Sequence, residues 1–186
     1  MRKVILVVNT TVDGNLSGPN GELDWMIDDP ELGADFAAAM YEGVDTVLSG
    51  RNCHLGFQQH FGATAADPDF PAGLRRFASW MVETPSVVFS STLTEAGPNA
   101  SVATDIAATV AELKARPGKD MVVFGGVATA RAFVGLGLVD EYWLKVHPVV
   151  IGAGQPLFQG TADRSGLTLT EAKGYPSGVV GLRYRA

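Results

Sequence analysis

The feature that most constrains this chain is a pair of glycines between an apolar run and a helical pattern. Met121 to Phe124 is a short apolar run of the kind that forms a strand buried on both faces. Gly125-Gly126 follows at once, where a chain can turn without a side chain in the way. Val127 to Leu136 then carries apolar residues at helical spacing, and Gly137 can end that helix in a left-handed conformation. The stretch therefore predicts a strand, a glycine turn and a helix.

Such a turn has two interpretations. A helix N-terminus presents unpaired backbone N–H groups and a partial positive charge, and the missing side chains let an anion approach the backbone. The turn is then suited to a phosphate group. Alternatively, it is only a tight connection between a strand and a helix, because a glycine pair by itself is a weak signal.

The remaining segments alternate between strand and helix patterns and end in two strands. Alternation with helical crossovers predicts an α/β fold: a three-layer domain with a mostly parallel central sheet of about eight strands, helices on both faces and an antiparallel C-terminal hairpin. Residues 55–71 lose all periodicity and are expected to form an irregular, mobile surface excursion. The expected strands are Lys3 to Val8 (central), Val44 to Ser49, Ser86 to Phe89, a short one at Val102, Tyr142 to Val150, Leu167 to Ala172 and Val179 to Tyr184. The other expected helices are Asp29 to Glu42, Leu74 to Met81 and one that begins at Thr104 or Asp105.

Composition limits the class of protein. With 186 residues and 46% hydrophobic content, residues 1–186 are expected to form a single domain with a real core. A net charge of −6 and a pI near 5.0 argue against nucleic acid as a partner. Cys53 is the only cysteine, and the N-terminal apolar run is too short for a signal peptide or a membrane span, so we expect a cytoplasmic protein that is not membrane-bound. The three histidines lack metal-ligand spacing, so no metal site is expected.

Four segments are expected to meet at one edge of the sheet. Ligands of parallel α/β sheets bind at the carboxyl ends of the strands. That rule brings together Val8 to Thr10, Gly50-Arg51, Ser90 to Thr92 and Gly125-Gly126, all of them rich in small or hydrogen-bonding residues. The convergence favours an anionic, nucleotide-like ligand over a simple turn.

Six motifs, in this order and at these spacings, resemble a known superfamily. They are TTVDGNLSG, GELDW, VDTVLSGRN, VVFSSTL, VVFGGVATARAF and GLVDEYWLKVHPVVIGAGQPLF, and they cover nearly the whole chain. The chain resembles the dihydrofolate-reductase-like superfamily. Within it, the chain is similar to the C-terminal reductase domain of the bifunctional riboflavin-biosynthesis deaminase/reductase.

The resemblance implies a reduced nicotinamide cofactor, NADPH, across the strand ends. The cofactor positions that it implies are Asn9, Leu16, Gly50, Arg51, Asn52, Ser90, Ser91, Thr92, Phe124, Gly125, Gly126, Val127, Ala128 and Thr129. It also implies a cis peptide between the two glycines. The chemistry of the residues agrees, since Arg51 offers a guanidinium to a ribose phosphate and the glycines admit a pyrophosphate to backbone N–H groups.

The substrate end rests mainly on the resemblance. Val8 and Asn9 are expected to line the floor, Leu16 to lie in a mobile loop over the nicotinamide, and Asp24 and Trp25 to form the rim. The resemblance also implies an acidic catalytic residue on the first helix. Asp35 is the candidate, and it either binds a pyrimidine or pterin-like ring by two hydrogen bonds or faces water.

The sequence therefore predicts an NADPH-dependent reductase that passes a hydride to a C=N or C=O bond of a small, polar, heterocyclic substrate. The alternatives are a non-redox nucleotide- or pterin-binding protein on the same fold and a true dihydrofolate reductase. Large residues on both faces of Tyr142 to His147 favour a symmetric homodimer built on the Tyr142 to Phe158 region. Gly126 is expected to need a conformation that only glycine tolerates.

Overall fold

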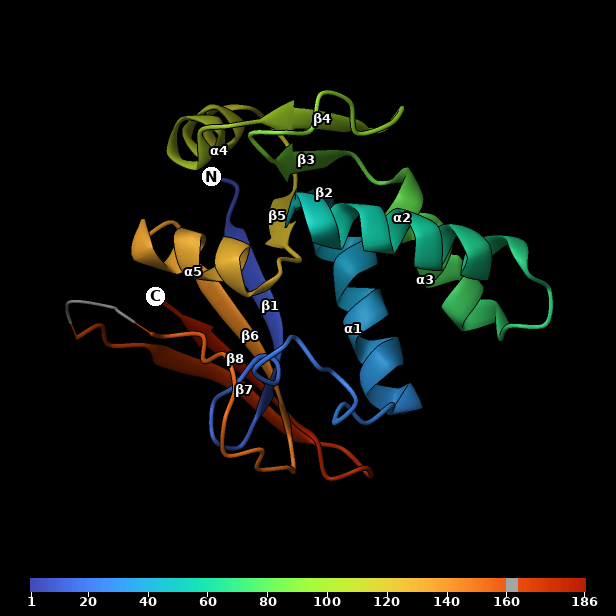
Figure 1. Cartoon of the computed structure of the whole chain (residues 1–186), viewed down its shortest axis with the longest axis vertical. Helices are drawn as coiled ribbons and strands as arrows, with labels where there is room; N and C mark the ends of the chain where they lie inside the picture. Colours follow the sequence, from blue (N-terminus) through green and yellow to red (C-terminus); the bar gives the residue numbers. More distant parts are fainter. Residues whose placement is uncertain (160–163) are drawn as a thin grey trace.

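The computed structural model describes residues 1–159 and 164–186, and they form one mixed sheet flanked by helices (Figure 1). The sheet has eight strands in the order β4-β3-β2-β5-β1-β6-β8-β7. The strands are β1 (Val4–Thr11), β2 (Val44–Gly50), β3 (Ser86–Phe89), β4 (Ala100–Ala103), β5 (Asp120–Val123), β6 (Glu141–His147), β7 (Thr168–Gly174) and β8 (Val180–Arg185). The helices are α1 (Pro30–Gly43), α2 (Arg51–Ala66), α3 (Ala72–Glu83), α4 (Ile106–Ala115) and α5 (Val127–Gly135).

The predicted fold class is confirmed. The first six strands pair in parallel, with β1 between β5 and β6, and β8 pairs antiparallel with both β6 and β7. The hairpin turns at Gly178, whose φ of 86° lies in the left-handed region that glycine favours. Gly137 ends α5 in the same region, with a φ of 64°. Both turns follow from the sequence pattern.

Alternate residues of β1 build two separate cores. Val4, Leu6 and Val8 pack on one face of the sheet with Phe133 of α5 and Val110 of α4. On the other face, Ile5 and Val7 pack with Met40 of α1 and with partly buried aromatic residues of α1 and α3. A strand buried on both faces reads as a continuous apolar run, which is why the start of β1 is recognisable in the sequence.

Residues 55–71 correct the prediction of an irregular excursion. Most of them belong to α2, which runs from Arg51 to Ala66. The helix contains Gly56 and Gly62 and has little apolar periodicity, so the sequence pattern does not predict a helix there. Packing provides the missing stabilisation, because the Phe61 ring meets Phe77 of α3 edge-on at a centroid distance of 5.8 Å. Tertiary contacts therefore decide a helix that local propensity leaves open.

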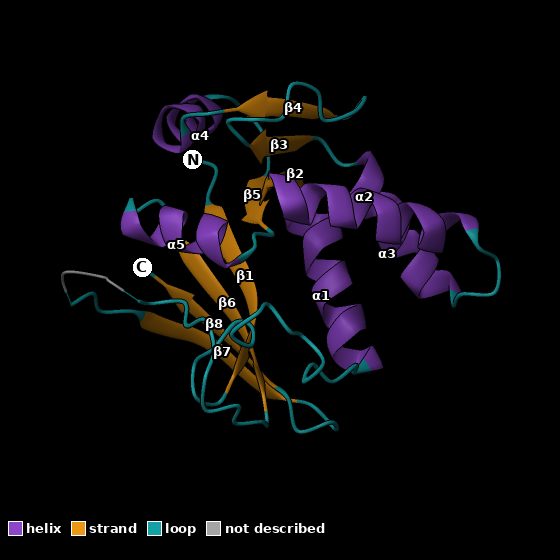
Figure 2. Cartoon of the chain, in the orientation of Figure 1, coloured by secondary structure: helices purple, strands orange, loops and turns teal. Residues whose placement is uncertain are grey.

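The helices gather around the parallel part of the sheet. In Figure 2, β7 and β8 carry loops rather than a helix on the side away from α1. Leu169 on β7, which is 53% exposed, lies on this part of the sheet. No helix in the described residues is long and apolar enough to cross a membrane.

Candidate functional site: a glycine end and a lysine end

The carboxyl ends of four parallel strands meet as predicted. β3, β2, β5 and β1 are consecutive in the sheet, so the segments that follow them lie side by side (Figure 1). Three contacts tie these segments together. Phe124 N–H donates to the Leu48 carbonyl at 3.0 Å, Arg51 Nη1 donates to Thr92 Oγ1 at 2.9 Å, and a side chain at Gly50 would collide with Thr129. We call the set Gly50, Arg51, Thr92, Gly126 and Thr129 the glycine end of the candidate site.

Two helices begin at the glycine end without a capping side chain. The N-cap residue of α2 is Gly50 and that of α5 is Gly126, and neither helix start has a side-chain cap hydrogen bond. In contrast, Asp29 caps α1 by accepting from Leu32 N–H at 3.0 Å, and Asp105 caps α4 by accepting from Ala108 N–H at 2.9 Å. Uncapped first-turn N–H groups remain available to a ligand, and the helix dipole adds partial positive charge there. Two such starts side by side are chemically suited to an anion with more than one phosphate.

The two adjacent glycines have different reasons to be glycine. A Cβ on Gly125 would lie 2.9 Å from Thr129 Cβ and 3.2 Å from Ala130 N, so the fold itself requires glycine there. Gly126 has φ −63° and ψ 167°, which any residue adopts, and a Cβ there would meet only Cys53 Sγ at 3.4 Å. The expectation that Gly126 needs a glycine-only conformation is therefore wrong. The expected cis peptide between the glycines is also absent, since the described residues contain none.

The polar residues around Arg51 differ in whether their side chains already have hydrogen-bond partners in the protein. Ser90 Oγ accepts from the backbone N–H groups of Thr92 at 3.2 Å and Leu93 at 2.9 Å, so Ser90 shapes its own turn. Ser91 and Asn52 are exposed, as are Arg51 and Thr92. The Arg51 guanidinium thus stands at the open edge of the glycine end, where it donates to a hydroxyl from the segment after β3.

The rest of the predicted cofactor stretch follows the turn. Phe124 is partly buried, and its ring lies edge-on to Phe36 of α1 at a centroid distance of 5.8 Å. Val127 and Ala128 occupy the first turn of α5. Val127 packs against the core on the α5 face, whereas Ala128 is exposed. The Phe124–Phe36 contact joins the glycine end to α1.

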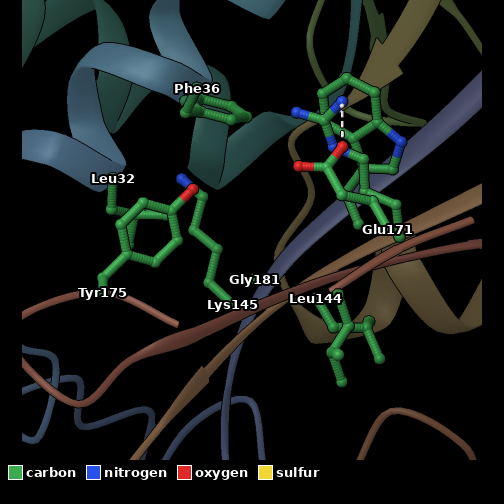
Figure 3. Close-up of a pocket in the computed structure, with 10 residues that line it drawn as sticks. Leu32, Phe36, Leu144, Lys145, Glu171, Tyr175 and Gly181 are labelled. Atoms are coloured by element: carbon green, nitrogen blue, oxygen red, sulfur yellow. Dashed lines mark ion pairs between the residues drawn. The ribbon is translucent and has the colours of Figure 1, made fainter. Parts of the chain in front are cut away.

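Phe36 also lines an open cleft whose enclosed volume is about 30 Å³. Leu32 and Phe36 face it from α1, Lys145 from β6, and Tyr175 from the turn after β7 (Figure 3). Trp143 of β6 lines it as well. We call these five residues the lysine end. The Lys145 amine lies 3.5 Å from the centroid of the Phe36 ring. Burial lowers the pKa of this amine to about 8, because a charged amine loses its hydration in such surroundings.

Asp35 lies at the edge of this cleft and is not among the residues that line it. Its carboxylate accepts from Lys173 Nζ at 2.5 Å and from the Tyr175 hydroxyl at 3.2 Å. The hydrogen bond from Lys173 is the main reason that the pKa of Asp35 is lowered. Leu32 and Phe36 are one turn apart and form the face of α1 that meets the cleft. The catalytic role of Asp35 stays a prediction, but its present partners argue against direct contact with a ligand.

Asn9 and Trp25 meet at a buried histidine. The Ile27 N–H donates to His147 Nδ1 at 3.1 Å, so Nε2 carries the ring proton and donates to Asn9 Oδ1, also at 3.1 Å. The Trp25 ring lies edge-on to the imidazole at a centroid distance of 5.4 Å. Burial is the largest cause of the lowered pKa of His147, and the nearby Lys145 charge adds to it. His147 therefore holds the segment before α1 against the end of β1.

The other predicted substrate residues lie elsewhere. Val8 and Leu16 are buried in the core on the α5 face and line a second hollow there. The loop that carries Leu16 is fixed by backbone hydrogen bonds, including Leu16 N–H to the Gln155 carbonyl at 2.9 Å. Leu16 thus lies in the core on the α5 face, and the mobile loop over the nicotinamide stays a prediction. Asp24 is exposed.

Neither Lys145 nor His147 was predicted from the sequence to be a site residue. The alternation along β6 does place Trp143, Lys145 and His147 on one face of the strand. A lysine between two aromatic side chains on a strand is an unusual core pattern. The sequence does not show which helix covers this face, because α1 lies more than one hundred residues away in the chain.

Comparison with known proteins places this geometry in a family. The model of the RibD C-terminal domain matches residues 2–180. The chain belongs to the RibD C-terminal domain family. Two Bacillus subtilis proteins of unassigned function resemble it over nearly their whole length: YyaP, at 37% identity over 98% of this chain and 94% of that protein, and YwjB, at 26% identity over 96% and 95%.

Solved structures support the fold of this RibD C-terminal domain. A Shewanella sp. PV-4 protein described as a riboflavin biosynthesis protein superposes with a TM-score of 0.74 at 22% identity, over 98% of both chains. The Thermotoga maritima diaminohydroxyphosphoribosylaminopyrimidine deaminase/5-amino-6-(5-phosphoribosylamino)uracil reductase superposes with a TM-score of 0.66 at 14% identity, over 99% of this chain and 56% of that one. The present chain thus corresponds to about half of the bifunctional protein.

Proposed function

We propose that this protein is an NADPH-dependent reductase that transfers a hydride to a C=N or C=O bond of a small, polar heterocycle, either pterin-like or like a ribosylated aminopyrimidine. The observation that carries the proposal is the pair of uncapped helix starts at Gly50 and Gly126, with Arg51 beside them. Membership in the RibD C-terminal domain family supports it, as does the uracil reductase named among the structural relatives.

The glycine end fits the charged part of such a cofactor. The first-turn N–H groups of α2 and α5 would bind the pyrophosphate, and Gly126 leaves the space through which it reaches the backbone. Arg51 and Thr92 would bind the phosphate on the adenosine ribose. When bound, the nicotinamide supplies the hydride, and the protein supplies position and electrostatics.

The chain orders the rest of the site around that position. Phe36 of the lysine end packs edge-on against Phe124, which precedes the glycine pair, and this aromatic contact would limit the access of water between the two ends. His147 holds Asn9 and the segment around Ile27 in place through its two ring nitrogens. The proposal includes a homodimer, which the large residues on both faces of Tyr142 to His147 favour. It also includes a cytoplasmic location, in keeping with Cys53 as the single cysteine.

Two experiments test the proposal. Isothermal titration measures the binding of NADPH. The decrease in NADPH absorbance then measures its oxidation in the presence of pterins or of a ribosylated aminopyrimidine. We expect binding in the micromolar range and oxidation with at least one of these compounds. Binding without any oxidation would support a non-redox nucleotide-binding protein on the same fold. A protein that binds no NADPH would contradict the proposal.

A further inference from the structure

Lys145 is the one lysine of this chain without an acceptor among the described residues. The other four lysines donate to Glu141, Asp140, the Tyr41 carbonyl and Asp35. Lys145 instead points at the face of the Phe36 ring, 3.5 Å from its centroid. A cation over an aromatic face gains about 0.5 to 2 kcal/mol, less than the cost of burying an unpaired charge. The site is therefore electrostatically incomplete without a further partner.

The amine lines an open cleft at which the edge of a small ring can approach it. The enclosed part of this cleft is small, about 30 Å³, so a ring would rest at its mouth and present one edge to Lys145. The other walls of the cleft are apolar or aromatic at Leu32, Phe36 and Trp143. The charged groups nearby are already paired: Arg183 with Glu171 at 3.1 Å, and Lys173 with Asp35 and Glu31. A ligand in the cleft would thus meet one free cation and no free carboxylate.

We propose that Lys145 recognises the substrate, and that it selects a small heterocycle that turns a carbonyl oxygen or an anionic edge toward β6. An acidic residue on α1 would select the opposite chemistry, namely an amidine or a protonated ring nitrogen. The face of α1 that meets the cleft presents Leu32 and Phe36 instead. This inference deepens the proposed function, since it names the polarity of the substrate edge, but it does not depend on cofactor binding.

Two six-membered rings of opposite edge chemistry test the inference. Orotate is an anionic pyrimidine with two ring carbonyls, and 2,4-diaminopyrimidine carries an amidine edge. We expect isothermal titration to show binding of orotate and at least tenfold weaker binding of 2,4-diaminopyrimidine. Lys145→Met should weaken orotate by about tenfold to hundredfold, the range for one charge-assisted hydrogen bond. The matched control Lys119→Met removes an exposed lysine and should leave both affinities unchanged.

The pH dependence provides a second readout. Burial lowers the pKa of Lys145 to about 8, so orotate affinity should fall between pH 7 and pH 9.5 as the amine loses its charge. The pKa values of His147 and Asp35 are lowered, and those of Lys173 and Tyr175 are raised, so these neighbours titrate away from this window. The other charged groups nearby are held in ion pairs, Glu171 with Arg183 and Glu31 with Lys173. The Lys145→Met variant should show a flat profile.

Three outcomes would overturn the inference: equal orotate affinity in the wild type and Lys145→Met, tighter binding of 2,4-diaminopyrimidine than of orotate, or no binding of either ring. NADPH titration of the same variants separates this inference from the proposed function. Lys145→Met should bind NADPH like the wild type. If orotate binds through Lys145 but NADPH does not bind at all, the reductase proposal fails and the recognition role of Lys145 stands.

Discussion

The two ends of the candidate site are built in opposite ways. The glycine end consists of backbone groups, missing side chains and one exposed arginine, and its residues follow directly after strands in the sequence. The lysine end consists of side chains from α1, β6 and the turn after β7, which are far apart in the sequence. The first end offers many weak, oriented dipoles to a large anion, whereas the second offers a single desolvated charge to a small ring. A backbone site is recognisable from local motifs, and a side-chain site of this kind only from packing.

The largest expected effect breaks the glycine end alone. Gly126→Val should abolish NADPH binding, because the side chain fills the space beside the α5 start, while the backbone conformation there suits any residue. Isothermal titration measures the affinity and thermal unfolding checks the fold. Gly135→Val, at the other end of α5 where a Cβ meets nothing within 4 Å, is the matched control. A folded Gly126→Val protein with wild-type affinity would show that the glycines form only a turn.

Arg51 should discriminate between the two nicotinamides. NADPH carries an additional phosphate with close to two negative charges, and Arg51 is the cation at the open edge of the glycine end. Arg51→Ala should weaken NADPH by about tenfold to hundredfold, from roughly 1.5 to 3 kcal/mol for a charged hydrogen bond, and leave NADH nearly unchanged. Arg116→Ala, an exposed arginine near Glu112, is the control. Equal losses for both cofactors would assign Arg51 to the pyrophosphate or the fold.

We expect a homodimer on the face of β6, β8 and β7 that is opposite the lysine end. Leu169, Tyr184 and Tyr142 are aligned across β7, β8 and β6, and the Phe158 ring contacts Tyr142. Leu169 is 53% exposed. Light scattering should give twice the mass of one chain for the wild type and one chain for Leu169→Asp, while Leu74→Asp on α3 should stay dimeric. A wild-type protein of single-chain mass at micromolar concentration would contradict the dimer.

The smallest expected effect concerns His147, which joins β6 to the segment before α1. Its pKa is lowered below 6.5 in the folded protein, mainly by burial. The unfolded chain therefore takes up the proton first, and stability is full above about pH 6.5 and declines as the pH falls below it. Urea unfolding at pH 7 and pH 5.5 should show this loss in the wild type and a smaller one in His147→Gln. His60→Gln, on the exposed face of α2, should behave like the wild type.

Much of the fold was determined by the sequence alone. The alternation of apolar runs and helical patterns predicts the parallel sheet, and β3 has the predicted bounds, Ser86–Phe89. Asp105 was predicted as a possible N-cap from its residue type, and in the structure it caps α4. The glycine pair, the start of α5 and the convergence at the strand ends were predicted from the same local patterns. These features depend on backbone conformation over a few residues, which side-chain type controls directly.

The tertiary structure decided the rest. Aromatic packing on α3 stabilises α2 as a helix. Phe36, rather than Asp35, lines the cleft. The position at which a Cβ would collide with its neighbours is Gly125 and not Gly126. The tertiary structure also surrounded Lys145 with residues from α1 and β8, so that an ordinary lysine on a strand acquired a pKa of about 8. Burial and desolvation depend on neighbours that are distant in the chain, and no local pattern in the sequence contains them.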